Sequence, residues 1–196
     1  MKLSLAKIIS IILNPIVLAF FAPFFLIYKT THDVQLAINW SLYTLIFISI
    51  FGLFTIISVK KKIITDMDIS KREQRSFVYI VGILFSSIYL ISLFFFHGPF
   101  ILYFSTIGII IGVSFLSIVN RKIKASIHTA TITALILPVA ISYGNYYYLL
   151  LFLIPLIIWA RLKTKRHTPL EIFVGGTIGG FLSLSLYYIA RVFLNK

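Results

Sequence analysis

The sequence predicts an all-α fold, a polytopic membrane helical bundle of about seven transmembrane helices. Of its 196 residues, 60% are hydrophobic and only 12% are charged. Apolar runs of about 20 residues, long enough to cross a ~30 Å hydrocarbon layer, recur along the whole chain. Short loops rich in Lys and Arg separate these runs, as is typical of multi-pass membrane proteins. We therefore expect a single integral membrane domain over residues 1–196 and no separate soluble domain.

Seven apolar segments make up this prediction. Their approximate bounds are 8–28, 37–58, 77–96, 100–119, 126–144, 146–160 and 169–193. The first segment is long, and no small-residue cleavage site follows it, so we expect a retained helix rather than a signal peptide. Asn14-Pro15 and Pro23 are expected kinks within that helix.

The later segments carry their own local signals. Gly144-Asn145 predicts the turn between the fifth and sixth segments. The Tyr146–Tyr148 run and Trp159, at the two ends of the sixth, are typical of aromatic residues at a membrane interface. In the seventh, Gly175-Gly176 and Gly179-Gly180 repeat small residues at a four-residue spacing, which favours close helix packing.

The net charge of +13 would indicate a nucleic-acid partner in a soluble protein. Here the charges lie in short loops, so we expect anionic lipid headgroups as partners and no nucleic acid. With seven spans, 15 of the 18 Lys and Arg residues share the side of the N-terminus, and three lie opposite. This imbalance predicts that the basic side is cytoplasmic, in the cell (inner) membrane. Nothing in the sequence indicates an oligomeric state.

Three basic loops share the predicted cytoplasmic side, at residues 59–76, 120–127 and 161–168. His128 and His167 lie at or beside the second and third of these loops. Lys and Arg side chains provide charge and donors suited to phosphate, and imidazoles serve as nucleophiles or proton donors near neutral pH. In the competing interpretation, the basic residues only set the topology and the histidines are incidental interfacial residues.

The third loop runs directly into a helix start. Thr168 is the expected N-cap, Pro169 suits the first helical position, and Glu171 stands where a capping-box carboxylate belongs. Capping explains these three residues but not the crowding of His167 and four basic residues at the same membrane edge.

The spacing around this loop resembles a known family. Arg161, five intervening residues, His167, three more, and then Glu171 resemble the third motif of the type 2 phosphatidic acid phosphatase family. Here Glu171 stands for the family's aspartate, and Ala160 for the serine that precedes the arginine. Ser126-Ile127-His128 resembles the second motif, Pro-Ser-Gly-His, with Ala125 in place of proline and Ile127 in place of glycine.

The first motif of the family has a weaker counterpart. The run from Lys71 to Arg75 lies where the lysine-and-arginine motif belongs, although Asp68 stands where that motif has its lysine. The resemblance covers about residues 60–180. It implies a six-helix phosphatase-like core over about 37–193, with the first helix as an addition.

The resemblance implies metal-independent hydrolysis of a phosphate monoester or diphosphate on a lipid: a phosphatidate, a phosphatidylglycerol phosphate or a polyprenyl phosphate. His167 would attack phosphorus to form a phosphohistidine, Glu171 would orient its other ring nitrogen, and His128 would protonate the leaving oxygen. The implied phosphate-binding residues are Arg161, Arg72, Arg75, Lys71, Ser126 and Lys124. No metal and no cofactor is expected, and the sequence lacks the dense carboxylate cluster that would hold magnesium.

Two other functions compete with this one. A non-catalytic membrane protein could bind anionic lipid headgroups, or carry a phosphate-bearing substrate, with the same cations and without the histidines. An intramembrane prenyltransferase would need two acidic clusters, but the chain has only five acidic residues, so we expect Asp66 and Asp68 to be solvated loop residues. The absence of cysteine excludes disulfides, thiolate catalysis and Cys-ligated metals.

The side of the membrane on which the site lies follows from two opposed arguments. The family resemblance favours a site facing away from the cytoplasm, whereas the charge count favours the cytoplasm. When six candidate site residues are set aside, nine Lys and Arg residues still remain on the basic side, against three opposite. These six are Lys71, Arg72, Arg75, Lys124, Arg161 and Arg166. We therefore predict a cytoplasm-facing site.

Overall fold

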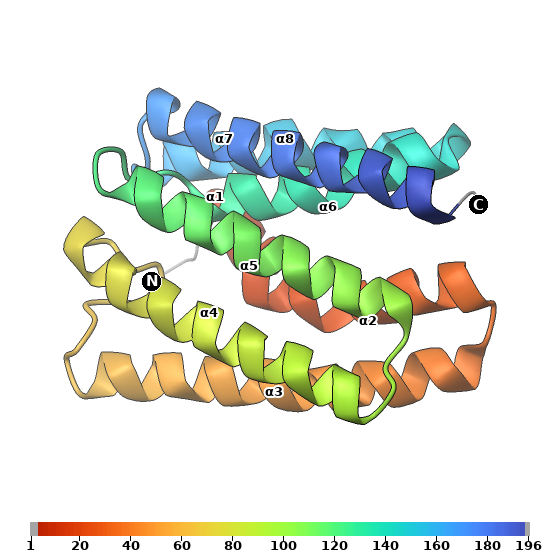
Figure 1. Cartoon of the computed structure of the whole chain (residues 1–196). Helices are drawn as coiled ribbons and strands as arrows, with labels where there is room; N and C mark the ends of the chain where they lie inside the picture. Colours follow the sequence, from red (N-terminus) through yellow and green to blue (C-terminus); the bar gives the residue numbers. More distant parts are fainter. Residues whose placement is uncertain (1–3, 195–196) are drawn as a thin grey trace. The chain divides into compact units, whose positions relative to one another are not determined.

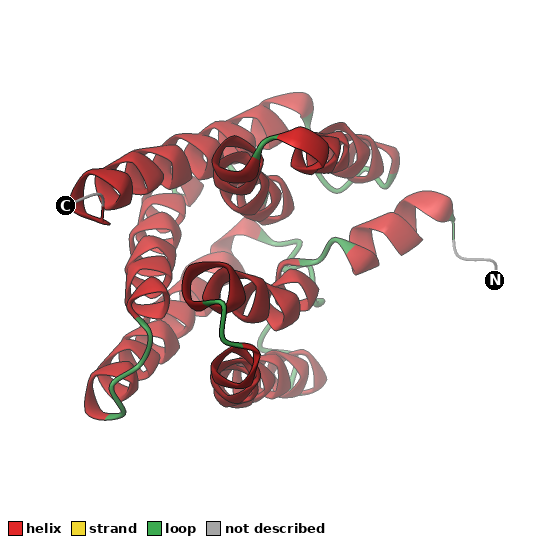
Figure 2. Ribbon diagram, turned by 90° about the vertical axis from the view of Figure 1, so that its right-hand side faces the viewer, coloured by secondary structure: helices red, strands yellow, loops and turns green. Residues whose placement is uncertain are grey.

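The computed structural model describes residues 4–194, and every regular element in that range is a helix (Figure 2). In chain order these are α1 (Leu5–Ile12), α2 (Pro15–Thr31), α3 (Val34–Lys60), α4 (Arg72–Phe95), α5 (Phe100–Asn120), α6 (Ile127–Tyr143), the 3₁₀ helix η1 (Asn145–Phe152), α7 (Leu153–Lys163) and α8 (Pro169–Leu194) (Figure 1). The all-α prediction is confirmed. Lys2 and Lys196, which the charge count includes, lie outside the described residues.

The helices are those of a multi-pass membrane protein. Five segments are long and apolar enough to cross a membrane: α3, α4, α5, the continuous η1–α7 segment and α8. A sixth span forms if α1 and α2, which meet at a bend of 43°, count as one. The remaining predicted segment, the fifth (126–144), corresponds to α6, which is apolar but has only 17 residues. At 1.5 Å per residue it is about 25 Å long, shorter than the hydrocarbon core.

The bend between α1 and α2 has a local cause. Pro15 is the first residue of α2, and a proline disfavours the helical conformation of the residue before it. The side chain of that residue, Asn14, accepts a hydrogen bond from the Ile16 amide at 2.9 Å through Oδ1. The break predicted at Asn14-Pro15 is thus confirmed, whereas Pro23 lies inside α2.

The chain forms two compact units, and each is described by itself. The central unit comprises residues 18–121, and the split unit comprises residues 1–17 together with 122–196. In the central unit α4 packs against both α3 and α5. Its buried cluster joins Tyr89 and Leu93 of α4 to Ala37 of α3 and Leu102 of α5. The Tyr89 hydroxyl and Thr44 Oγ1 lie 2.6 Å apart, so this apolar cluster includes one satisfied polar pair.

In the split unit, α6 and α8 lie side by side along their length (Figure 1). Gly175 and Gly179 of α8 make this approach possible. A Cβ atom at Gly175 would overlap the Ser126 carbonyl, and one at Gly179 would overlap the Ala130 carbonyl. The predicted small-residue packing is therefore confirmed, with α6 as its partner. Two further helices pack on this pair in the same unit. α7 contacts both α6 and α8, and α1 packs on α7.

Candidate functional site

The start of α8 forms the predicted capping box. The Glu171 amide donates to Thr168 Oγ1 at 3.3 Å, and the Thr168 amide donates to Glu171 Oε2 at 3.2 Å. Pro169 is the first residue of the helix, where its missing N–H has no intrahelical partner to lose. These reciprocal bonds hold the Glu171 carboxylate in place at the helix start.

The same carboxylate oxygen also contacts His167. Glu171 Oε2 lies 2.8 Å from His167 Nδ1, and the His167 side chain is only 1% exposed. Because an ionised carboxylate only accepts hydrogen bonds, this contact puts a proton on Nδ1, and in the neutral imidazole the lone pair is then on Nε2. The capping box therefore orients Glu171, and Glu171 in turn orients the imidazole and selects its tautomer.

The loop before α8 folds back on the end of α7. The Arg166 amide donates to the Arg161 carbonyl at 3.2 Å, and the Lys165 amide to the Leu162 carbonyl at 2.9 Å. Lys165 takes a left-handed conformation with φ of 54°. This tight return leaves the Lys165 and Arg166 side chains exposed beside the buried His167.

These residues line a hollow of about 340 Å³ at the end of the split unit. Its lining residues are Lys124, Leu162, Lys165, Arg166, His167, Thr168 and Glu171. The volume is at the low end for small-ligand sites, and three of the seven lining side chains are cationic. Such a hollow can hold a small anion beside an oriented imidazole. Lys165 was not among the predicted phosphate-binding residues, although its place in the basic loop between Arg161 and His167 was a usable signal.

The start of α6 is joined to the start of α8 through the backbone. The Ser126 amide donates to the Glu171 carbonyl at 3.0 Å, and Ser126 Oγ caps α6 by accepting from the Thr129 amide at 3.4 Å. His128 lies in the first turn of α6 and is buried. The fold thus brings the second and third predicted motifs together, although Ser126 and His128 are not among the residues that line the hollow.

Arg161 has a structural contact that the sequence did not reveal. Its side chain is 1% exposed, and Nη1 donates to Ser10 Oγ at 2.7 Å. Ser10 lies in α1, which packs on α7 and is 151 residues away in the sequence. The helix predicted to be an addition therefore holds a predicted site residue. No local pattern around Ser10 indicated this contact.

The first predicted motif belongs to the central unit, where α4 begins at Arg72 rather than after Arg75. Arg, Glu and Gln are good helix formers, so this polar stretch extends the helix beyond its apolar run. Lys71 and Arg72 are exposed at the helix start. Arg75 is buried, and its Nε donates to the Ile69 carbonyl at 3.0 Å. Arg75 thus fastens the preceding loop to the first turn of α4.

The acidic residues of that loop form a local turn, in which the Asp68 amide donates to Asp66 Oδ1 at 2.9 Å. Both residues are half-buried. Within residues 4–194, no group of three or more His, Asp or Glu residues is arranged to hold a metal ion.

No family model, no curated protein and no solved structure matches the chain. The chemistry of the hollow is therefore inferred from its own residues: three cations that can bind an anion, and a histidine whose tautomer is set by a carboxylate.

Proposed function

We propose that the chain is a membrane-embedded lipid phosphatase that hydrolyses a phosphate monoester or diphosphate of a lipid through a phosphohistidine. The observation that carries this proposal is the contact of 2.8 Å between His167 Nδ1 and Glu171 Oε2, beside a cationic hollow. A phosphatase of this kind needs an imidazole that a carboxylate holds at one ring nitrogen, so that the other nitrogen can attack phosphorus. It also needs cations that stabilise the negative charge of the phosphoryl oxygens. The resemblance of the Arg161–Glu171 spacing to the type 2 phosphatidic acid phosphatases supports the same assignment.

In the first step, His167 Nε2 attacks phosphorus, an N–P bond forms, and the P–O bond to the lipid alcohol breaks. His128 gives a proton to the departing oxygen. Glu171 keeps the proton on Nδ1 and stabilises the positive charge that the phosphorylated imidazole acquires.

In the second step, a water molecule attacks phosphorus and the N–P bond breaks. The water proton passes to His128, which restores the acid for the next turnover, and inorganic phosphate leaves. In both steps the cations offset negative charge spread over the phosphoryl oxygens. Lys124, Lys165 and Arg166 line the hollow, and the resemblance adds Arg161 and Ser126 of the same unit to the proposed set.

The proposed location is the cell (inner) membrane, with the hollow facing the cytoplasm. The excess of Lys and Arg on the side of the three basic loops supports this orientation, because such residues resist translocation.

The test is phosphate release by purified protein in lipid nanodiscs, with chelator present. The substrates are a phosphatidate, a phosphatidylglycerol phosphate and a polyprenyl phosphate. His167→Ala should abolish release while the protein stays folded. His32→Asn is the matched control, since His32 is exposed in the central unit and has φ of 55°, a conformation that Asn tolerates. Substantial turnover by His167→Ala would refute the nucleophile assignment.

A second candidate is a non-catalytic protein that binds or carries an anionic lipid in the same hollow. The observation that favours it is the position of His128, which is buried and is not among the residues lining the hollow. Three cations suffice for binding. If the wild type releases no phosphate from any substrate but retains phosphatidate more strongly than phosphatidylcholine during purification, this candidate replaces the phosphatase.

A further inference from the structure

We propose that a hydrocarbon chain of the lipid phosphate lies in an apolar groove of the split unit, formed by α6, α7 and α8. This inference rests on the proposed function, because it assigns the chain of the same lipid whose phosphate occupies the cationic hollow. The groove would make the site selective for lipid phosphates over soluble phosphate esters.

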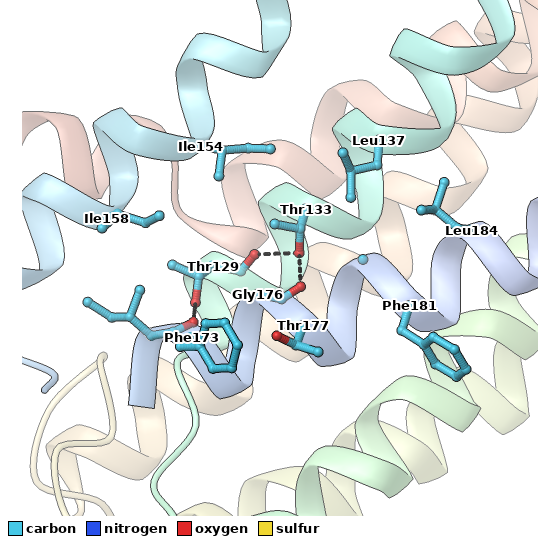
Figure 3. A pocket seen from close by; sticks show the side chains of 12 residues that line it. Thr129, Thr133, Leu137, Ile154, Ile158, Phe173, Gly176, Thr177, Phe181 and Leu184 are labelled. Carbon is cyan, nitrogen blue, oxygen red and sulfur yellow. Dashed lines mark hydrogen bonds between the residues drawn. The ribbon is translucent and has the colours of Figure 1, made fainter. Parts of the chain in front are cut away.

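The groove has a volume of about 400 Å³ and takes side chains from all three helices (Figure 3). Its walls include Leu137 of α6, Ile154 and Ile158 of α7, and Phe181 and Leu184 of α8. Gly176 and Gly180 also line it and leave room where any other residue would project a side chain.

The hydroxyls of the two α6 threonines in the groove, Thr129 and Thr133, are already hydrogen-bonded. Thr133 Oγ1 donates to the Gly176 carbonyl at 3.0 Å (Figure 3). Thr129 Oγ1 donates to the Ser126 carbonyl at 3.0 Å. Since these hydroxyls donate to helix carbonyls, they need no hydrogen-bond partner from a molecule bound in the groove. An apolar chain can therefore lie against these two residues without leaving a buried hydroxyl unbonded.

The groove and the cationic hollow have neighbouring lining residues on the same two helices. On α7, Leu162 lines the hollow, and Ile158, one turn earlier, lines the groove. On α8, Glu171 lines the hollow, and Ile172 and Phe173 line the groove. A phosphate in the hollow therefore lies within about one helical turn of residues that line the groove.

The length of the groove fits one lipid chain. From Phe173 to Leu184 it follows α8 for about 16 Å at 1.5 Å per residue. This is about half of the ~30 Å hydrocarbon core, or the depth of one leaflet. A partner transmembrane helix would need a groove through both leaflets. A lipid chain anchored by a headgroup at the surface needs only this depth.

The closing experiment uses phosphatidate with a diazirine at the middle of one acyl chain, in nanodiscs, with adducts mapped by mass spectrometry. We expect adducts on groove residues of α6, α7 and α8 in the wild type. Thr177→Trp fills the groove from an exposed position and should reduce those adducts about 10-fold. Ile189→Trp is the matched control, since Ile189 is also exposed on α8 but is not among the residues that line the groove.

Turnover provides an independent readout. Thr177→Trp should lower the ratio of kcat/KM for long-chain over dihexanoyl phosphatidate by about 10-fold, and Ile189→Trp should leave that ratio unchanged. Adducts spread evenly over the lipid-facing helices, or equal effects of the two substitutions, would overturn the groove assignment. Phosphate release would then still support the proposed function. Adducts confined to the groove without phosphate release would refute the phosphatase and leave the groove as a lipid-chain site.

Discussion

At the scale of single residues, Glu171 has two roles that one carboxylate oxygen performs together. Oε2 accepts the Thr168 amide of the capping box and also contacts His167 Nδ1. The first role stabilises the helix start, and the second belongs to the proposed chemistry. Substitution can separate them, because glutamine also forms capping boxes but lacks the negative charge.

We therefore expect Glu171→Gln to keep thermal stability within about 1 kcal/mol. Its phosphate release should fall roughly 10²- to 10⁴-fold, because the imidazole loses the carboxylate that sets its tautomer and stabilises its positive charge. Glu171→Ala should lose the cap as well, at about 0.5 to 2 kcal/mol. Thermal unfolding and phosphate release measure the two effects separately. If Glu171→Gln retained full turnover, the residue would be a helix cap only.

A second residue-scale prediction concerns Ser10 and the buried Arg161. The contact of 2.7 Å joins α1 to the end of α7, and a hydrogen bond to a charged group contributes about 1.5 to 3 kcal/mol. Ser10→Ala should lower the free energy of unfolding by that amount. Ser4→Ala is the control, since Ser4 is the exposed N-cap of α1 and its side chain makes no capping bond. Equal stability of the two variants in a detergent unfolding series would show that the Ser10 contact contributes little.

At the scale of elements, the pairing of α6 with α8 positions the site. It joins the start of α6 to the first turn of α8 through the hydrogen bond from the Ser126 amide to the Glu171 carbonyl. Gly179 permits the close approach farther along the helices, where an added Cβ would overlap Ala130 backbone atoms.

Gly179→Ala should therefore push α6 and α8 apart and destabilise the protein by about 1 to 3 kcal/mol. Gly112→Ala is a matched control on α5, where an added Cβ meets nothing within 4 Å. That control should instead gain up to about 1 kcal/mol from the lower conformational entropy of alanine in the unfolded chain. Thermal unfolding in detergent measures both. A Gly179→Ala variant as stable as Gly112→Ala would mean that the helices adjust without loss.

At the scale of the whole molecule, the sidedness of the loops depends on whether the 17-residue α6 crosses the membrane. If it does, four spans separate the end of α3 from the end of α7, and both ends lie on one side. If it does not, three spans separate them and the ends lie on opposite sides.

Single cysteines distinguish these topologies without background labelling, because the chain has no cysteine of its own. We expect Gln35→Cys, at the start of α3, to react with an impermeant maleimide in intact cells. Lys61→Cys and Lys163→Cys, near the ends of α3 and α7, should react only after permeabilisation. Labelling of Lys163→Cys but not Lys61→Cys in intact cells would show that α6 does not cross. If Lys61→Cys and Lys163→Cys reacted in intact cells and Gln35→Cys did not, the hollow would face the outside. The proposed chemistry would be unaffected.

Much of the fold was predictable because its signals are local. A hydrocarbon core requires every backbone group to bond within the chain, so long apolar runs become helices whatever their neighbours. Proline at position 15 and the Thr168–Glu171 capping box likewise act within a few residues of themselves. Helix ends at polar stretches were less predictable, and α4 begins at Arg72 because good helix formers precede its apolar part.

The sequence alone determined the helical membrane class, the position of most spans, and the pairing of His167 with Glu171, which lie one helical turn apart. Only the tertiary structure decided the contact of Arg161 with Ser10, the use of Arg75 to fasten its own loop, and the placement of the hollow and the apolar groove on neighbouring residues of α7 and α8. The physical reason is the distance along the chain over which each interaction acts. Caps and apolar periodicity act over one or two turns, whereas the partner of a buried arginine, or the helix against which a glycine packs, is set by residues distant in the chain that folding brings together.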